Sequence, residues 1–144
     1  MVNDMLAMNA TQVRNEWSAV VDAVIREKPQ FIKRTRDYML LSNVDTLERL
    51  LVAYSFHAAV FVEEDDSVTM SLDEIDLTEN GEDERSARLK MANAILEYAL
   101  DYYNDFAYWA RGNREAHLPY VFKALILNDV EKIGGLIECR PGES

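Results

Sequence analysis

Between residues 9 and 42 the apolar residues change from a helical spacing to two short runs typical of strands. In the first part of this stretch they recur at every third or fourth position, which predicts the buried face of a single helix. Asn9 or Thr11 can cap the start of this helix, and Pro29 ends it because the residue before a proline avoids the α region. The residues on the expected buried face are Val13, Trp17, Val20, Val21 and Val24.

A hairpin and a second helix are expected after Pro29. Residues 31–34 and 38–42 have the composition of strands, with residues 35–37 as their connection. The second helix begins near Val44, with Asn43 as its cap. A short apolar stretch (Met5, Leu6 and Met8) precedes the first helix as a strand, so the order is strand, helix, hairpin, helix. Because an isolated hairpin is marginally stable in water, this unit is expected to self-associate.

The pattern changes again after residue 57. Three apolar runs between residues 58 and 80 predict a three-stranded antiparallel sheet that ends in a turn at Asn80-Gly81. A long helix is expected at 84–109, followed by two short helices with Pro119 and Asp129 near their starts. The predicted fold is therefore α+β, with a dimerising module at 1–56 and a second α+β domain at 57–144.

The charge of the chain is divided unevenly. The net charge is −11, yet residues 1–43 carry six Lys or Arg and five Asp or Glu. The remaining residues carry nine Lys or Arg and twenty-one Asp or Glu. The densest cationic cluster, Lys33, Arg34 and Arg36, lies at the predicted hairpin, and Arg14 and Asn15 lie near the start of the preceding helix. These five residues predict an edge that binds DNA, although a solvated turn is the alternative for the hairpin cluster alone.

The sequence gives little support to the interpretation of this protein as an enzyme. His57 and His117 lie far apart in the sequence, and Cys139 is the single cysteine, so we expect no metal and no cofactor. The alternative is a small metal-dependent hydrolase that uses Asp73, Asp76 and Glu79. The lack of a long apolar run or a secretory signal predicts a cytoplasmic protein that does not associate with membranes.

The first third of the chain resembles the Phd/YefM (prevent-host-death) antitoxins. Their T-E-x-R-x-N helix start, their helix with an L-I/V-D pattern and their P-V-x-I-T-R strand are matched in order, with Asn15 one position closer to Arg14 than in the family motif. The matching residues are Thr11, Gln12, Arg14, Asn15, Val20, Val21, Asp22, Pro29, Phe31, Ile32, Arg34, Leu40, Leu41 and Ser42. The chain departs from the family at Gln12, which replaces Glu, and at residues 35–37, where the family often has Gly and Pro.

This resemblance implies a homodimer or higher homo-oligomer that binds operator DNA, represses its own operon and neutralises a toxin encoded beside it. By position it implies DNA contacts at Arg14, Asn15 and Arg34, with Lys33 and Arg36 as additions. The alternative is a protein-interaction module without DNA binding.

Residues 58–99 are similar to HicB-type antitoxin domains, through Gly81, Glu84, Ala87 and Tyr98. This second resemblance implies that the acidic half faces a basic ribonuclease toxin. Within the long helix, Tyr102, Tyr108 and Trp109 are candidate contacts to such a partner, and core packing is the alternative for these aromatic residues.

Overall fold

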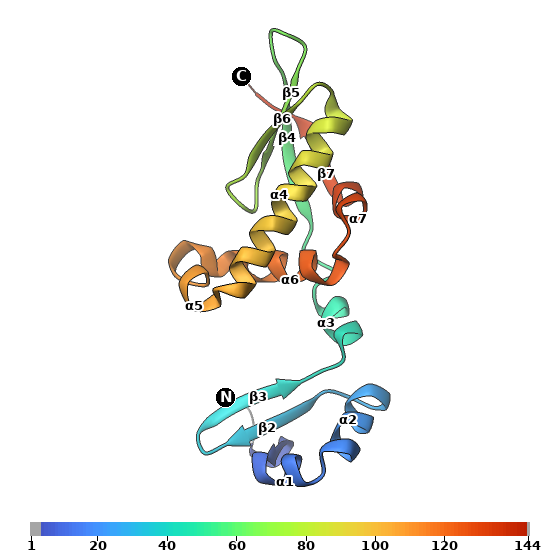
Figure 1. Ribbon diagram of the computed structural model, residues 1–144, viewed down its shortest axis with the longest axis vertical. Helices are drawn as coiled ribbons and strands as arrows, with labels where there is room; N and C mark the ends of the chain where they lie inside the picture. The colour runs from blue at the N-terminus through green and yellow to red at the C-terminus, as the bar shows by residue number, and fades with distance from the viewer. Residues whose placement is uncertain (1–3, 144) are drawn as a thin grey trace. The chain divides into compact units, whose positions relative to one another are not determined.

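The computed structural model of the protein describes residues 4–143. By its internal contacts the chain divides into two compact units, Met1–Leu50 and Leu51–Ser144, which we call the N-terminal and C-terminal units. Both combine helices with a sheet (Figure 1). The predicted α+β fold is confirmed.

The N-terminal unit has the predicted order of strand, helix, hairpin and helix. Its sheet has the order β1-β2-β3, in which β1 runs parallel to β2 and β3 antiparallel to it. Its elements are η1 (Asp4–Leu6), β1 (Ala7–Asn9), α1 (Ala10–Asn15), α2 (Trp17–Arg26), β2 (Gln30–Arg34), β3 (Asp37–Leu41) and α3 (Val44–Leu50).

The helix predicted after Asn9 is interrupted. Asn9 caps α1 by accepting a hydrogen bond from the Thr11 amide at 2.8 Å, but the backbone at Glu16 leaves helical geometry and α2 begins at Trp17. Trp17, the first residue after the interruption, is 53% exposed instead of buried, whereas Val20 and Val24 are buried as predicted. The core of the unit is formed by Val13, Val20, Val24 and Ile32.

The C-terminal unit holds a four-stranded sheet covered by helices. Its strand order is β6-β5-β4-β7. Its elements are β4 (Phe56–Val62), β5 (Val68–Leu72), β6 (Thr78–Gly81), α4 (Glu84–Asn104), α5 (Phe106–Trp109), η2 (Gly112–His117), α6 (Leu118–Leu127), α7 (Val130–Gly135) and β7 (Ile137–Pro141).

The three antiparallel strands and the two short C-terminal helices agree with the prediction, and three details differ. A fourth strand, β7, pairs in parallel with β4. The long helix ends at Asn104 because the backbone at Asp105 departs from helical angles, and α5 follows as a separate turn. Asn80 and Gly81 belong to β6 instead of forming a turn.

Gly81 is required by a close approach between β6 and α4. A Cβ atom at this position would lie 2.8 Å from the carbonyl carbon of Ser86 and 2.9 Å from the Cα of Ala87. Because both are backbone atoms, only a glycine lets the strand pass so close to the first turn of the helix.

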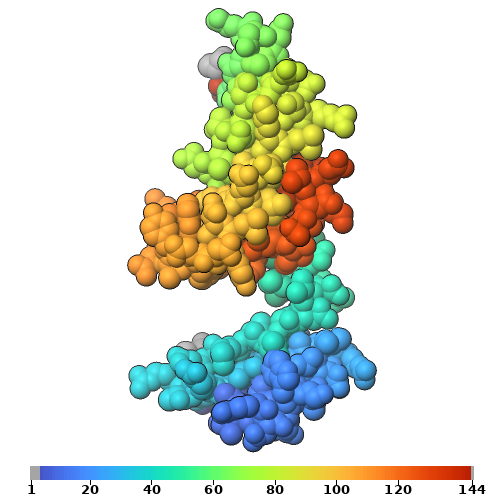
Figure 2. Space-filling view, in the orientation of Figure 1, coloured from blue at the N-terminus to red at the C-terminus, as the bar shows by residue number. Residues whose placement is uncertain are grey.

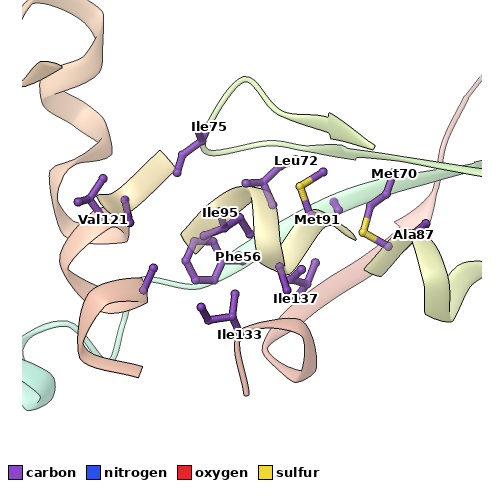
Figure 3. Packing of buried hydrophobic residues seen from close by; sticks show 14 of the residues in the cluster. Phe56, Met70, Leu72, Ile75, Ala87, Met91, Ile95, Val121, Ile133 and Ile137 are labelled. Carbon is purple, nitrogen blue, oxygen red and sulfur yellow. The ribbon is translucent and has the colours of Figure 1, made fainter. Parts of the chain in front are cut away.

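The core of the C-terminal unit lies between the sheet and α4, with α6 and α7 closing its side (Figure 3). Arg88 ties α4 to the end of the chain by donating to the carbonyl oxygens of Gly134 at 2.9 Å and Ile137 at 2.6 Å. The largest fully buried side chains are Tyr102, Phe56, Met70, Met91, Ile95, Ile133 and Val121. None of the described helices has both the length and the apolar content needed to cross a membrane.

Candidate nucleic-acid interface

The β2–β3 hairpin presents the basic cluster on a tight turn. Arg34 pairs with Asp37 across the strands, which leaves Thr35 and Arg36 as a two-residue loop. Two-residue hairpin loops need a positive φ in the loop, and Thr35 supplies it with a φ of 57°. Arg34 therefore precedes, and Arg36 belongs to, a turn of defined conformation instead of a loose loop.

Three of the five predicted DNA-binding residues have free guanidinium groups. Arg14, Arg34 and Arg36 are exposed, and their side chains make no ion pair or hydrogen bond to any other residue in the described range 4–143. An unpaired, exposed guanidinium group keeps its five N–H donors available for a phosphate or a guanine edge.

Lys33 is placed differently from its neighbours. Its ammonium group lies 3.2 Å from Asp4 Oδ1 and 5.3 Å from the centre of the Tyr38 ring. The hydrogen bond to Asp4, followed by that to Tyr38, raises the pKa of Lys33, and the Tyr38 hydroxyl also donates to Asp4. The charge of Lys33 is therefore largely compensated within the unit.

Arg14 and Arg34 lie on one side of the sheet. Side chains alternate between the faces of a strand, so Arg34 shares the face of Ile32, which packs against the helices, and Lys33 lies on the opposite face. Arg14 and Ile32 border the same open hollow of about 530 Å³. The other residues of this hollow, including the exposed Trp17 and Met39, were not identified from the sequence as part of a site; its lining is Ala10, Val13, Arg14, Trp17, Ile32 and Met39.

Arg14 and Asn15 do not open a helix, as the sequence had suggested. They form the last turn of α1, immediately before the interruption at Glu16. The favourable electrostatic field of a helix N-terminus is therefore not available at Arg14, and any DNA contact there depends on the side chain itself.

The charge division also follows the two units. Residues 1–50 carry seven Lys or Arg and seven Asp or Glu, while residues 51–144 carry eight Lys or Arg and nineteen Asp or Glu. The whole net charge of −11 thus belongs to the C-terminal unit. A polyanion is repelled less by the neutral unit than by the acidic one.

The three predicted partner contacts differ in their exposure. Tyr102 is fully buried and donates a hydrogen bond to the Arg114 carbonyl oxygen at 2.7 Å, so its ring is not available to a partner. Trp109 is partly buried against Tyr98. Tyr108 is 59% exposed, with the Arg114 guanidinium 4.9 Å from its ring centre.

The two histidines and the single cysteine make contacts within the C-terminal unit. His57 bridges two carboxylates, with Nδ1 2.8 Å from Glu74 and Nε2 3.2 Å from Glu138, and the hydrogen bond to Glu74 raises its pKa. The Tyr98 hydroxyl lies 2.7 Å from His117 Nδ1, and burial lowers the pKa of His117. Burial raises the pKa of the Cys139 thiol, which does not favour a reactive thiolate.

The carboxylates of the hydrolase alternative do not gather into a metal site. Asp73 forms two hydrogen bonds with the Arg140 guanidinium, at 2.7 and 3.0 Å, which neutralise its charge. Over residues 4–143, no three His, Cys, Asp or Glu side chains are grouped so that they could hold a metal ion.

Comparisons with known proteins identify the family. The model of the PHD_like family, described as an antitoxin of a toxin-antitoxin, RelE/RelB, TA system, matches residues 5–139. A crystal structure from Syntrophomonas wolfei subsp. wolfei, of an antitoxin part of a candidate toxin/antitoxin system, is 34% identical in sequence and superposes with a TM-score of 0.89. The similarity covers 94% of this chain and 99% of that one.

None of the curated proteins matches the chain. The narrower resemblance of the first third to the Phd/YefM antitoxins, and that of residues 58–99 to HicB-type domains, stay predictions. The match over nearly the whole chain and the similarity to a solved antitoxin nevertheless agree with each other. The chain belongs to the PHD_like family of antitoxins of toxin-antitoxin systems.

Proposed function

We propose that this antitoxin is a dimeric DNA-binding autorepressor of the Phd/YefM type that also neutralises its cognate toxin by direct binding. The observation that supports DNA binding most strongly is the set of three exposed, unpaired guanidinium groups of Arg14, Arg34 and Arg36 on the neutral N-terminal unit. Asn15 is adjacent to Arg14 and supplies an amide for the same contact.

In this proposal the guanidinium groups bind the DNA backbone and the edges of guanine bases. Arginine is suited to both because its planar fork forms two parallel hydrogen bonds to a phosphate or to guanine O6 and N7. Lys33 adds less, because Asp4 already accepts from its ammonium group. A symmetric dimer duplicates the set and reads a pseudo-palindromic operator.

The C-terminal unit is the proposed toxin-binding part. An antitoxin has a cognate toxin as its partner, and a unit with a net charge of −11 attracts a basic protein. We therefore propose a basic toxin, such as a ribonuclease, with Tyr108 and Trp109 among its contacts. Toxin binding then alters operator affinity by thermodynamic linkage, because both ligands bind the same dimer.

The experiment is a fluorescence-anisotropy titration of the DNA upstream of the gene for this chain. The native protein is compared with the Arg14→Ala, Arg34→Ala, Arg36→Ala triple variant at several salt concentrations. About six phosphate contacts per dimer give a slope of log affinity against log salt of about −5, and the triple variant is expected to lose both the affinity and most of the slope.

A matched control removes the same charge from the C-terminal unit. Arg85, Arg111 and Lys132 are exposed, and the triple alanine variant at these positions is expected to bind DNA like the native protein. Equal losses of DNA affinity in both triple variants would show that binding depends only on the net charge of the protein. Equal affinity of the native protein for operator and scrambled DNA would instead favour an interaction module without operator recognition.

A further inference from the structure

The end of α4 and the short α5 expose a group of apolar side chains. Leu100 and Tyr103 lie on the outer side of the last two turns of α4, and Phe106 and Tyr108 belong to α5. Their exposed fractions are 43%, 56%, 43% and 59%, respectively. Figure 2 shows this part of the C-terminal unit, in orange, as a lobe at one side of the unit. We call these four residues the α4–α5 face.

The face is held in place by aromatic contacts beneath it. The Tyr103 ring packs edge-on against Phe122 of α6, with 6.2 Å between the ring centres, and Phe106 packs in the same way against the buried Tyr102 at 5.8 Å. Arg114 donates to the Tyr108 carbonyl oxygen at 2.8 Å and lies over its ring. Side chains that are ordered before binding lose less conformational entropy on binding, which favours them as anchors.

The surroundings of the face are acidic. From Met91 to Ala110 the chain has three carboxylates and no Lys or Arg. Asp101 and Asp105 are exposed, and neither side chain has a hydrogen-bond or ion-pair partner within residues 4–143. Glu97, one turn before Asp101, is also exposed and contacts only the neutral amide of Asn93, at 3.2 Å. On its α4 side the rim of this apolar face therefore carries uncompensated negative charge, whereas on its α5 side Arg114 lies over the Tyr108 ring.

This charge argues against a second copy of the chain as the occupant. Packing two such faces together would bring the carboxylates of both copies to the same interface, where like charges repel. A segment with an apolar stripe bordered by Lys or Arg would instead bury the rings and neutralise the rim. A cationic side chain of that segment can also stack on the exposed ring of Tyr103.

We propose that the α4–α5 face is the docking surface for a basic amphipathic segment of the cognate toxin. This inference rests on the proposed function, since it requires that the C-terminal unit binds a basic toxin. It adds the location of the contact and the chemistry of the toxin segment. It also assigns Leu100, Tyr103 and Phe106 as toxin contacts, in addition to Tyr108.

The test measures the affinity of the full-length chain for the purified product of the adjacent gene by isothermal titration calorimetry. The Leu100→Ala, Tyr103→Ala variant is expected to lose at least about 100-fold in affinity, as for central interface anchors. The Asp101→Asn, Asp105→Asn variant keeps the shape of the side chains and removes their charge. Its affinity for the gene product is expected to be about 10-fold lower and to depend less on salt concentration.

Matched controls come from the β4–β5 hairpin. Val62 is 72% exposed, and Glu64 and Asp66 are exposed as well. The Val62→Ala variant removes an exposed apolar side chain, and the Glu64→Gln, Asp66→Asn double variant removes two exposed carboxylates, both elsewhere on the same unit. Both controls are expected to bind within about twofold of the native protein, as non-interface substitutions do. Thermal melting checks that every variant is folded, and hydrogen exchange of the native complex is expected to protect residues 96–108 without any substitution.

The outcomes separate the inference from the proposed function. Native binding that the Leu100, Tyr103 variant retains, without protection of residues 96–108, overturns the α4–α5 face and leaves toxin neutralisation intact. Failure of the native chain to bind the adjacent gene product overturns the proposed toxin and the inference with it. Loss of affinity in the face variants alone, with protection of residues 96–108, supports the inference.

Discussion

Arg140 forms two parallel hydrogen bonds with Asp73, from Nη1 to Oδ2 at 2.7 Å and from Nη2 to Oδ1 at 3.0 Å. The pair joins β7, near the end of the chain, to the turn that follows β5. Because β7 pairs with β4 and not with β5, this ion pair adds a connection that the strand ladder does not supply.

We expect Asp73→Asn to destabilise the C-terminal unit slightly at neutral pH, because both side chains are partly exposed and solvent weakens the pair. The hydrogen bond to Arg140 lowers the pKa of Asp73. A lowered carboxyl pKa contributes stability above the pKa of the unfolded state, and this contribution is lost as the pH falls through the folded pKa. Melting temperatures of the native and variant proteins should therefore differ at pH 7 and converge in acid. A difference that grows in acid would contradict this account.

His57 is expected to give the opposite pH dependence. Its pKa is raised by the hydrogen bond to Glu74, with further contributions from the charges of Glu138 and Asp73. Its contribution to stability is complete below the unfolded pKa of about 6.5 and is lost as the pH rises through the folded value. Thermal melts between pH 5 and pH 9 should show that His57→Gln destabilises the protein at the low end and has little effect at the high end.

His117 provides the comparison within the same unit. Burial lowers its pKa, so its neutral form is favoured in the folded state and its contribution is lost as the pH falls below about 6.5. The stability lost in a His117→Gln variant should therefore be largest at high pH. Parallel pH profiles for the two histidine variants would show that local environment does not determine their titration.

Gly81→Ala should destabilise the protein by about 2 kcal/mol, because the new methyl group meets the backbone of the first turn of α4. Gly135 is the matched control, since a Cβ atom there has no neighbour within 4 Å. Gly135→Ala should change stability by less than about 1 kcal/mol, and in the stabilising direction. Urea unfolding of both variants measures the difference, and similar values for the two would contradict the close approach of β6 and α4.

Lys33 and Arg34 should contribute unequally to operator binding although they are adjacent. Lys33 already pairs with Asp4, whereas Arg34 has no partner among the described residues. We expect Lys33→Ala to lower operator affinity by less than about threefold and Arg34→Ala by about tenfold or more, as for the loss of a charged contact. Asp4→Asn should raise affinity by freeing Lys33. Equal effects of the two alanine substitutions in the anisotropy titration would rule out this distinction.

Features determined by neighbouring residues were predictable from the sequence. Asn9 and Asp129 are caps whose side chains bond to amides two or three residues later, and such spacings are visible in the sequence. The hairpin was also found, because its strands are separated by a short polar turn.

Features determined by distant pairing were not predictable in this way. β7 is stabilised by parallel pairing with β4, a strand about 80 residues earlier, so its own short sequence did not identify it as a strand. The compensation of Lys33 depends on Asp4, which lies 29 residues away. Trp17 is exposed directly after the interruption at Glu16, which the regular apolar spacing concealed.

The most direct test of the central claim, that one chain separates a DNA-binding edge from a toxin-binding face, is a single strain with two readouts. The adjacent gene product is induced to arrest growth, and a reporter is driven from the DNA upstream of this gene. The Arg14, Arg34, Arg36 alanine variant should restore growth but fail to repress the reporter. The Leu100, Tyr103 alanine variant should repress the reporter but fail to restore growth. Variants that lose both activities together while remaining folded, or that lose neither, would contradict the account.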